Sequence, residues 1–154
     1  MDISFKTEHG RFNYRVSAVI FRNDCLLTMQ DNAYSYSYLP GGRVKMGETS
    51  EQAMRREMQE ELHADLSLLR PLWFCQNFFT EEDTGERFHE ICIYYLVDGN
   101  SLPEVPFSYA EGERINRFSW TPLGDLRSMH LYPEFIKEKI HFLPDHPEMI
   151  CEYH

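Results

Sequence analysis

Residues 41–64 read GGRVKMGETSEQAMRREMQEELHA, and they say more about the fold than any other part of the chain. They predict a glycine loop followed by a helix over residues 49–62. Thr49 and Gln52 have the spacing of a capping box, in which each side chain bonds the other residue's backbone at the start of a helix. An apolar residue recurs at every fourth position from Met54 to Leu62, which predicts a stripe that packs the helix onto a core.

Three glutamates of the predicted helix indicate a metal site. At about 100° per residue, Glu57, Glu60 and Glu61 fall within one narrow sector of the helix surface. Like charges at these spacings repel by roughly a few tenths of a kcal/mol per pair, so helix stability does not favour them. A hard cation such as Mg²⁺ would turn this repulsion into ligand binding, and the upstream Gly41-Gly42 would let the backbone approach a metal or phosphate closely. The alternative is a solvated acidic helix face.

The spacing of these residues resembles a known signature. Gly42, five residues, Glu48, seven residues and then REMQEE over residues 56–61 resemble the Nudix box of hydrolases that act on a nucleoside diphosphate linked to another moiety. One position departs, because His63 stands where the family usually has glycine. A glycine there is expected to end the helix in a left-handed conformation, which costs a non-glycine residue roughly 1 kcal/mol.

The resemblance implies one domain over residues 1–154 with the α/β/α sandwich of Nudix proteins, in which a mixed β-sheet lies between helices. The order of elements along the chain agrees with this expectation, since strands precede and follow the central helix. The elements expected outside that helix are strands within 12–29 with a turn at Asn23-Asp24, strands over 66–79 and 87–97, a loop over 102–109, a short strand over 117–120, and helices over 122–129 and 133–142.

The resemblance also implies a chemistry, the hydrolysis of a phosphoanhydride by attack of water on phosphorus. The expected ligands of one to three Mg²⁺ ions, or of Mn²⁺, are the carbonyl of Gly41 and the carboxylates of Glu57, Glu60 and Glu61. Arg56 and Glu48 are expected to orient these ligands.

A general base is also needed, and several carboxylates qualify. It is either a glutamate of the box or a carboxylate from the loop before the strand that ends at Trp120, where Glu111 and Glu113 are the candidates.

Four residues outside the box are candidates for contact with the substrate. Tyr34, Tyr36 and Tyr38 alternate before the glycine loop, so they form one face of an extended segment, and one of them could stack on a base. His89 is interpreted primarily as a residue of a strand, and contact with a phosphate is the second interpretation. The substrate itself stays open among nucleoside triphosphates, dinucleoside polyphosphates, nucleotide sugars and ADP-ribose.

Composition limits the kinds of molecule that the protein is expected to bind. A net charge of −10 disfavours a long nucleic acid and leaves a small nucleotide as substrate, because a bound cation reverses the local sign. No apolar run has the roughly 20 residues of a membrane helix. Four scattered cysteines and the lack of a secretion signal predict a cytoplasmic protein with reduced thiols. The aromatic-rich segments could support a homodimer.

A second class of function is open to a chain of this fold. Some proteins with a Nudix fold are non-catalytic nucleotide sensors or interaction domains, because a fold does not determine a function. Their box typically lacks one or more carboxylates, whereas this chain has all three. Hydrolysis is therefore the expected function.

Overall fold

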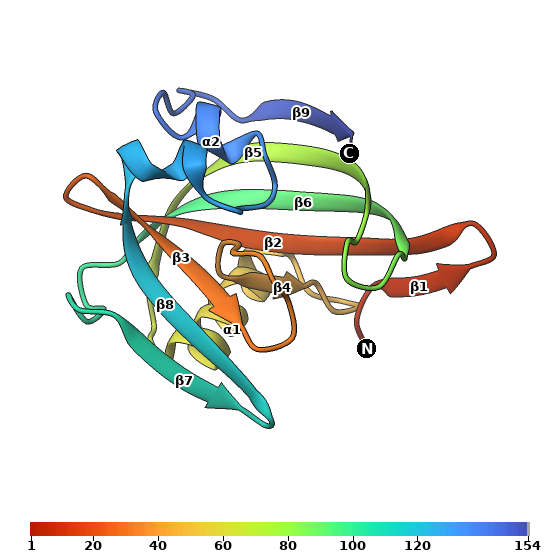
Figure 1. The fold of residues 1–154 in the computed structure, drawn as a ribbon, viewed down its shortest axis with the longest axis horizontal. Coiled ribbons are helices and arrows are strands. Elements are labelled where there is room, and N and C mark those ends of the chain that lie inside the picture. The colour runs from red at the N-terminus through yellow and green to blue at the C-terminus, as the bar shows by residue number, and fades with distance from the viewer. Residues whose placement is uncertain (154) are drawn as a thin grey trace.

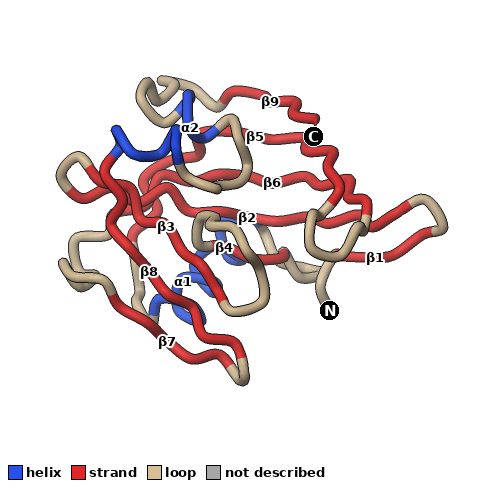
Figure 2. The backbone as a smooth tube through the Cα atoms, in the orientation of Figure 1, coloured by secondary structure: helices blue, strands red, loops and turns tan. Residues whose placement is uncertain are grey.

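The computed structural model describes residues 1–153, in which strands predominate (Figures 1 and 2). The strands are β1 (Ser4–Thr7), β2 (Gly10–Arg22), β3 (Cys25–Asp31), β4 (Gly41–Arg43), β5 (Ser67–Thr80), β6 (Arg87–Asp98), β7 (Phe107–Glu111), β8 (Arg114–Pro122) and β9 (Glu148–Tyr153). The helices are α1 (Ser50–Leu62), the 3-10 helix η1 (Leu123–Ser128) and α2 (Ile136–Lys139).

One mixed sheet organises the chain. Its strand order is β7-β8-β3-β2-β6-β5-β9, and β1 and β4 also pair with β2. The pairs β2–β6 and β5–β9 are parallel and the others are antiparallel. Helix α1 lies behind the sheet in Figure 1 and α2 lies in front of it, which confirms the expected mixed sheet between helices.

Strand β2 joins the two cores that this arrangement creates. Val16, Ala18 and Ile20 belong to the core that includes the apolar stripe of α1, whereas Val19 belongs to the core that includes Ile136 of α2. This division follows from the period of two along a strand, which sends alternate side chains to opposite faces of the sheet. Both cores therefore depend on the packing of β2.

Helix α1 begins and ends as its sequence predicts. Thr49 is its N-cap, and both hydrogen bonds of the capping box with Gln52 are present. His63 follows its last residue in the left-handed conformation, with φ 53° and ψ 36°. The departure from glycine at this position therefore leaves the backbone conformation unchanged.

The second half of the chain differs from the expectation in three elements. Residues 107–109 are not loop but part of β7, which pairs with β8. The helix expected over 133–142 has only one α-helical turn, because most hydrogen bonds around α2 span three residues rather than four. The tail contains a strand that sequence patterns did not indicate, β9, which pairs with β5. Strand β7 forms a hairpin with β8 across the turn at residues 112–113, whereas β9 pairs with a strand about 75 residues away, and local propensity encodes neither pairing.

One edge of β2 is divided among three strands, and the division opens space for a site. Residues 10–13 pair with β1, residues 15–17 pair with β4, and only Phe21 and Arg22 pair with β3. The segment 32–40 leaves β3 and returns along this edge to β4. None of the helices in residues 1–153 combines the length and the apolar character that crossing a membrane requires.

Candidate active site

A cleft of about 410 Å³ lies where the end of β4, the segment 32–40, the β5–β6 hairpin and the inner side of α1 meet. It is lined by two of the three helix glutamates, Glu57 and Glu61, and by Gly41 and Gly42, which lie in strand β4 rather than in the expected loop because they pair with β2. Residues that are distant in sequence, such as Glu90 of β6, complete its wall. The cleft has room for a ligand of nucleotide size.

The two glycines permit close approach on two sides of β4: Gly42 to Glu57 of α1, and Gly41 to the backbone of β2. A β-carbon on Gly42 would lie 2.2 Å from the Cδ atom of Glu57, and one on Gly41 would lie 2.1 Å from the carbonyl oxygen of Val16. The backbone N–H of Gly41 donates a hydrogen bond to Oε1 of Glu61 at 3.1 Å. Any side chain at Gly42 would therefore displace the Glu57 carboxylate from the cleft.

Glu57 and Glu61 are carboxylic acids in a place where burial disfavours their charged form. The Glu57 side chain is 12% exposed, and burial raises the pKa of its carboxyl group. Burial, and then repulsion by Glu57, raise the pKa of the Glu61 carboxyl group well above its ordinary value. Two buried oxygen-donor groups that repel each other are a donor set suited to a hard divalent cation.

The helix brings two of its three predicted ligands together. The Glu60 side chain is 46% exposed, lies outside the cleft lining and pairs with Arg56 at 3.3 Å. No group of three or more His, Cys, Asp or Glu side chains within residues 1–153 is arranged to hold a metal ion. The donor chemistry fits Mg²⁺, while Glu60 as a ligand stays a prediction.

Arg56 connects the helix to the preceding loop. Its guanidinium donates hydrogen bonds to Glu48 at 2.6 and 3.0 Å, to Glu57 at 2.8 Å and to the carbonyl oxygen of Arg43 at 2.9 Å. The hydrogen bond from Arg56 is the main cause that lowers the pKa of Glu48 to about 2. The positions of Arg56 and Glu48 therefore agree with the prediction that this pair orients Glu57.

The two candidate bases outside the box have different positions. Glu111, at the end of β7, lines the cleft, accepts a hydrogen bond from Asn116 at 3.2 Å and contributes to the raised pKa of Glu61. Glu113 is exposed in the turn between β7 and β8 and does not line the cleft. Position therefore favours Glu111.

All three alternating tyrosines line the cleft, but their contacts differ. The ring of Tyr34 stacks on that of Tyr36 at 5.3 Å, and Tyr36 also packs edge-on against Tyr132 at 5.2 Å. The Tyr38 hydroxyl donates a short hydrogen bond to Asp31, a carboxylate that is 1% exposed. Tyr38 is thus tied into the fold, whereas the Tyr34 hydroxyl makes no hydrogen bond within residues 1–153.

His89 lies away from the cleft. Its neighbour Glu90 lines the cleft, and successive side chains of a strand point to opposite faces, so His89 faces the other side of β6. There its ring lies 4.4 Å from that of Phe78 and 5.6 Å from that of Phe12. This position agrees with the interpretation of His89 as a strand residue. From there its ring does not reach a phosphate in the cleft.

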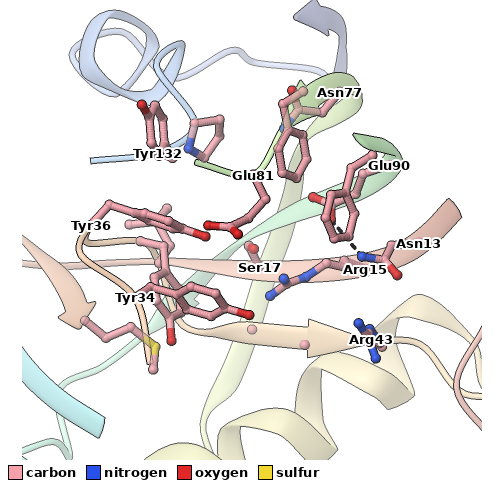
Figure 3. A pocket seen from close by; sticks show the side chains of 18 of the residues that line it. Asn13, Arg15, Ser17, Tyr34, Tyr36, Arg43, Asn77, Glu81, Glu90 and Tyr132 are labelled. Atoms are coloured by element: carbon pink, nitrogen blue, oxygen red, sulfur yellow. Dashed lines mark hydrogen bonds between the residues drawn. The ribbon is translucent and has the colours of Figure 1, made fainter. Parts of the chain in front are cut away.

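Sequence reasoning did not select Arg15, Asn13 and Glu90, which form part of the cleft wall (Figure 3). Asn13 donates a hydrogen bond to Glu90 at 3.4 Å. Within residues 1–153 the Arg15 guanidinium makes no hydrogen bond or ion pair, although burial lowers its pKa and the charges of Glu90 and Glu61 raise it. The alternation of polar and apolar residues along β2 could have indicated that Asn13 and Arg15 share one face of the strand.

A family model described as the NUDIX domain matches residues 11–145. The chain is 31% identical over 98 residues to MutT4 of Mycobacterium tuberculosis (strain CDC 1551 / Oshkosh), which is named as a candidate mutator protein. The match covers 62% of this chain and 36% of that protein, so the chain spans about a third of the length of this curated relative.

Two solved structures have a similar fold. An ADP-ribose pyrophosphatase from Streptococcus suis 89-1591 has a TM-score of 0.62 at 16% identity, with 92% of this chain and 98% of that chain covered. A UDP-X diphosphatase has a TM-score of 0.60 at 17% identity, with 84% of this chain and 59% of that chain covered. At these identities the likeness concerns the fold alone.

Proposed function

Because the chain belongs to the Nudix hydrolase family, we propose that it hydrolyses a phosphoanhydride bond in a nucleoside diphosphate derivative, with Mg²⁺ or Mn²⁺ as cofactor. One observation carries the proposal: Glu57 and Glu61 are buried together beside Gly41 and Gly42 in a cleft of nucleotide size. Two proteins of similar fold are named as a pyrophosphatase and a diphosphatase, so the fold is compatible with this reaction class. The proposal covers residues 1–154 as one domain.

The metal ligands in this proposal are Glu57, Glu60, Glu61 and the carbonyl of Gly41. When bound, the cation supplies positive charge to the diphosphate and makes the attacking water more acidic. Arg56 holds the Glu57 carboxylate at 2.8 Å and so limits its rotation.

The remaining roles fall to residues around the cleft. Glu111 accepts the proton of the attacking water at its carboxylate, because it lines the cleft and faces the charge of Glu61. Arg15 binds an anionic group of the substrate, since its guanidinium lies in the cleft wall without a bonded partner in residues 1–153. Tyr34 stacks on the base.

The decisive experiment is a substrate panel with a metal control. The release of nucleoside monophosphate or phosphate is measured from nucleoside triphosphates, dinucleoside polyphosphates, nucleotide sugars and ADP-ribose, each with Mg²⁺ and with EDTA. We expect Mg²⁺-dependent release from at least one class and almost none from the Glu61→Gln variant. No release from any class would refute the proposal and favour a ligand sensor, which isothermal titration with the same compounds would detect.

Location and assembly are part of the proposal. A cytoplasmic location is supported by the four cysteines, none of which forms a disulfide in residues 1–153. A homodimer is supported by apolar side chains left exposed on β9, where Met149 is 70% and Tyr153 is 73% exposed. Light scattering after size exclusion measures the oligomeric state directly.

A further inference from the structure

The residue that departs from the family signature makes a specific contact. His63 ends α1 in the left-handed conformation that glycine adopts without strain, and its ring stacks on Tyr109 of β7. The ring centroids are 4.0 Å apart and the planes differ by 17°. A glycine at this position would allow the same backbone but could not make this contact.

The stack connects the two parts of the site that carry carboxylates. Glu61 lies two residues before His63 on α1, and Glu111 lies two residues after Tyr109 on β7. Residues two apart on a strand share a face of the sheet, so Tyr109 and Glu111 point to the same side. Glu61 and Glu111 both line the cleft, and the charge of Glu111 raises the pKa of Glu61.

Strand β7 needs such a connection because it lies at an edge of the sheet. Its only strand neighbour in residues 1–153 is β8. The Tyr109 ring lies 6.4 Å from Phe118 of β8, and the Glu111 carboxylate accepts a hydrogen bond from Asn116 of the same strand. These contacts hold β7 to β8, whereas the contact with His63 holds it to the helix.

We propose that His63 is a positioning residue: its ring, stacked on Tyr109, holds β7 against the end of α1 and so sets the place of Glu111 beside Glu61. The inference rests on the proposed function, in which Glu111 accepts the proton of the attacking water. This role would explain why His63 occupies a position where the family usually has glycine. A cap that only ends the helix would have no effect on turnover.

Steady-state kinetics of three variants test the proposal. His63→Gly and Tyr109→Leu remove the stack, whereas Tyr109→Phe keeps the ring and serves as the matched control. Because small displacements of a catalytic group slow the reaction strongly, we expect the first two to lower kcat by about tenfold with KM nearly unchanged. Tyr109→Phe should retain the wild-type kcat. A wild-type kcat in His63→Gly would overturn the proposal.

A double-mutant cycle shows whether the effect passes through Glu111. In a Glu111→Gln background, His63→Gly should lower kcat no further, because the group that it positions has already lost its function. An equal loss in both backgrounds would overturn the role assigned to the stack. If the wild type hydrolyses no nucleotide while its fold is intact, the proposed function fails and this inference fails with it.

Hydrogen exchange tests the contact without any activity. Amides of residues 107–111 should exchange faster in His63→Gly and Tyr109→Leu than in the wild type and in Tyr109→Phe, since the edge strand loses its connection to α1. Unchanged exchange in both variants would refute the proposed connection. A fall of kcat together with unchanged melting temperature in His63→Gly would separate positioning from loss of the fold.

Discussion

At the scale of single residues, the candidate site depends on two neighbouring carboxyl groups in an environment that disfavours their charge. Glu57 and Glu61 repel each other, and burial raises the pKa of both. The Arg56 guanidinium compensates Glu57, and the only hydrogen bond to the Glu61 side chain within residues 1–153 comes from the Gly41 backbone. In the absence of a cation these carboxylates therefore lower the stability of the fold, which is typical of functional rather than structural residues.

Removing one of these charges should separate activity from stability. Glu61→Gln should lower kcat by at least about a hundredfold, because it removes a charged oxygen ligand. Its melting temperature in EDTA should equal or exceed that of the wild type, since a neutral amide ends the repulsion by Glu57 and still accepts the hydrogen bond from Gly41. Activity assays and thermal melts check both. Wild-type turnover at saturating Mg²⁺ would refute the ligand assignment.

We expect Tyr34 to contribute to substrate binding and Tyr38 to contribute to the stability of the fold. Tyr34→Leu should raise KM several-fold with little change in kcat, because a stacked base contributes about 1–3 kcal/mol to binding. Tyr38→Phe should instead lower the free energy of unfolding by about 1–3 kcal/mol, since the buried carboxylate of Asp31 loses a hydrogen bond. KM values and urea denaturation curves of both variants test this. The reverse pattern would show that the roles are exchanged.

At the scale of elements, the loop 43–48 is held to α1 by the Glu48–Arg56 ion pair. Glu48 also accepts a hydrogen bond from the backbone N–H of Lys45 at 2.9 Å, so one carboxylate links the loop to itself and to the helix. Arg56 in turn bonds the carbonyl of Arg43. The loop that follows the glycine strand β4 thus has a defined position relative to the glutamates of α1.

This ion pair should make stability depend on pH in a defined range. The pKa of Glu48 falls from its ordinary value of 4.5 to about 2 in the folded protein. A lowered pKa stabilises the fold above the unfolded-state pKa, and the gain is lost as the pH falls toward the folded-state value. The stability difference between wild type and Glu48→Gln should therefore shrink between about pH 5 and pH 2.

Urea denaturation across that range measures the effect of Glu48. Glu51→Gln is the matched control, because it removes the same charge from an exposed residue of the first turn of α1. That variant should keep the wild-type dependence on pH. A stability difference for Glu48→Gln that does not change with pH would contradict the assigned role of the ion pair.

At the scale of the whole molecule, the sheet couples two cores. The first lies between the sheet and α1 and includes Met54, and the second lies under η1 and α2 and includes Ile136. Strand β2 contributes side chains to both, and β6 does so through Tyr95 and Tyr94. Neither core can lose its packing without disturbing strands on which the other depends.

Damage to either core should therefore unfold the whole domain in one transition. Met54→Ala and Ile136→Ala should each lower the free energy of unfolding by about 2–5 kcal/mol, because both side chains are fully buried. Leu69→Ala, at a position 58% exposed, should change it by less than about 0.5 kcal/mol. Far-UV circular dichroism and tryptophan fluorescence should give coincident curves, and two separate transitions would contradict the coupling.

The sequence by itself determined the features that depend on neighbouring residues. The capping box at Thr49, the helix end at Leu62 and the turn at Asn23-Asp24 each involve only a few consecutive residues, and each is present. The regular spacing of the box glutamates likewise predicted that they share a helix face. Local hydrogen bonding and side-chain periodicity are sufficient for such features.

Only the tertiary structure decided which distant residues meet in the cleft. It placed Glu111 there rather than Glu113, turned His89 to the other face of β6, and added Arg15 and Glu90 to the wall. The strands β7 and β9 also became visible only as partners of β8 and β5. Apart from β7, which pairs with the adjacent strand β8, these features depend on contacts between residues far apart in the chain. Such contacts are set by the packing of whole elements rather than by any short stretch of sequence.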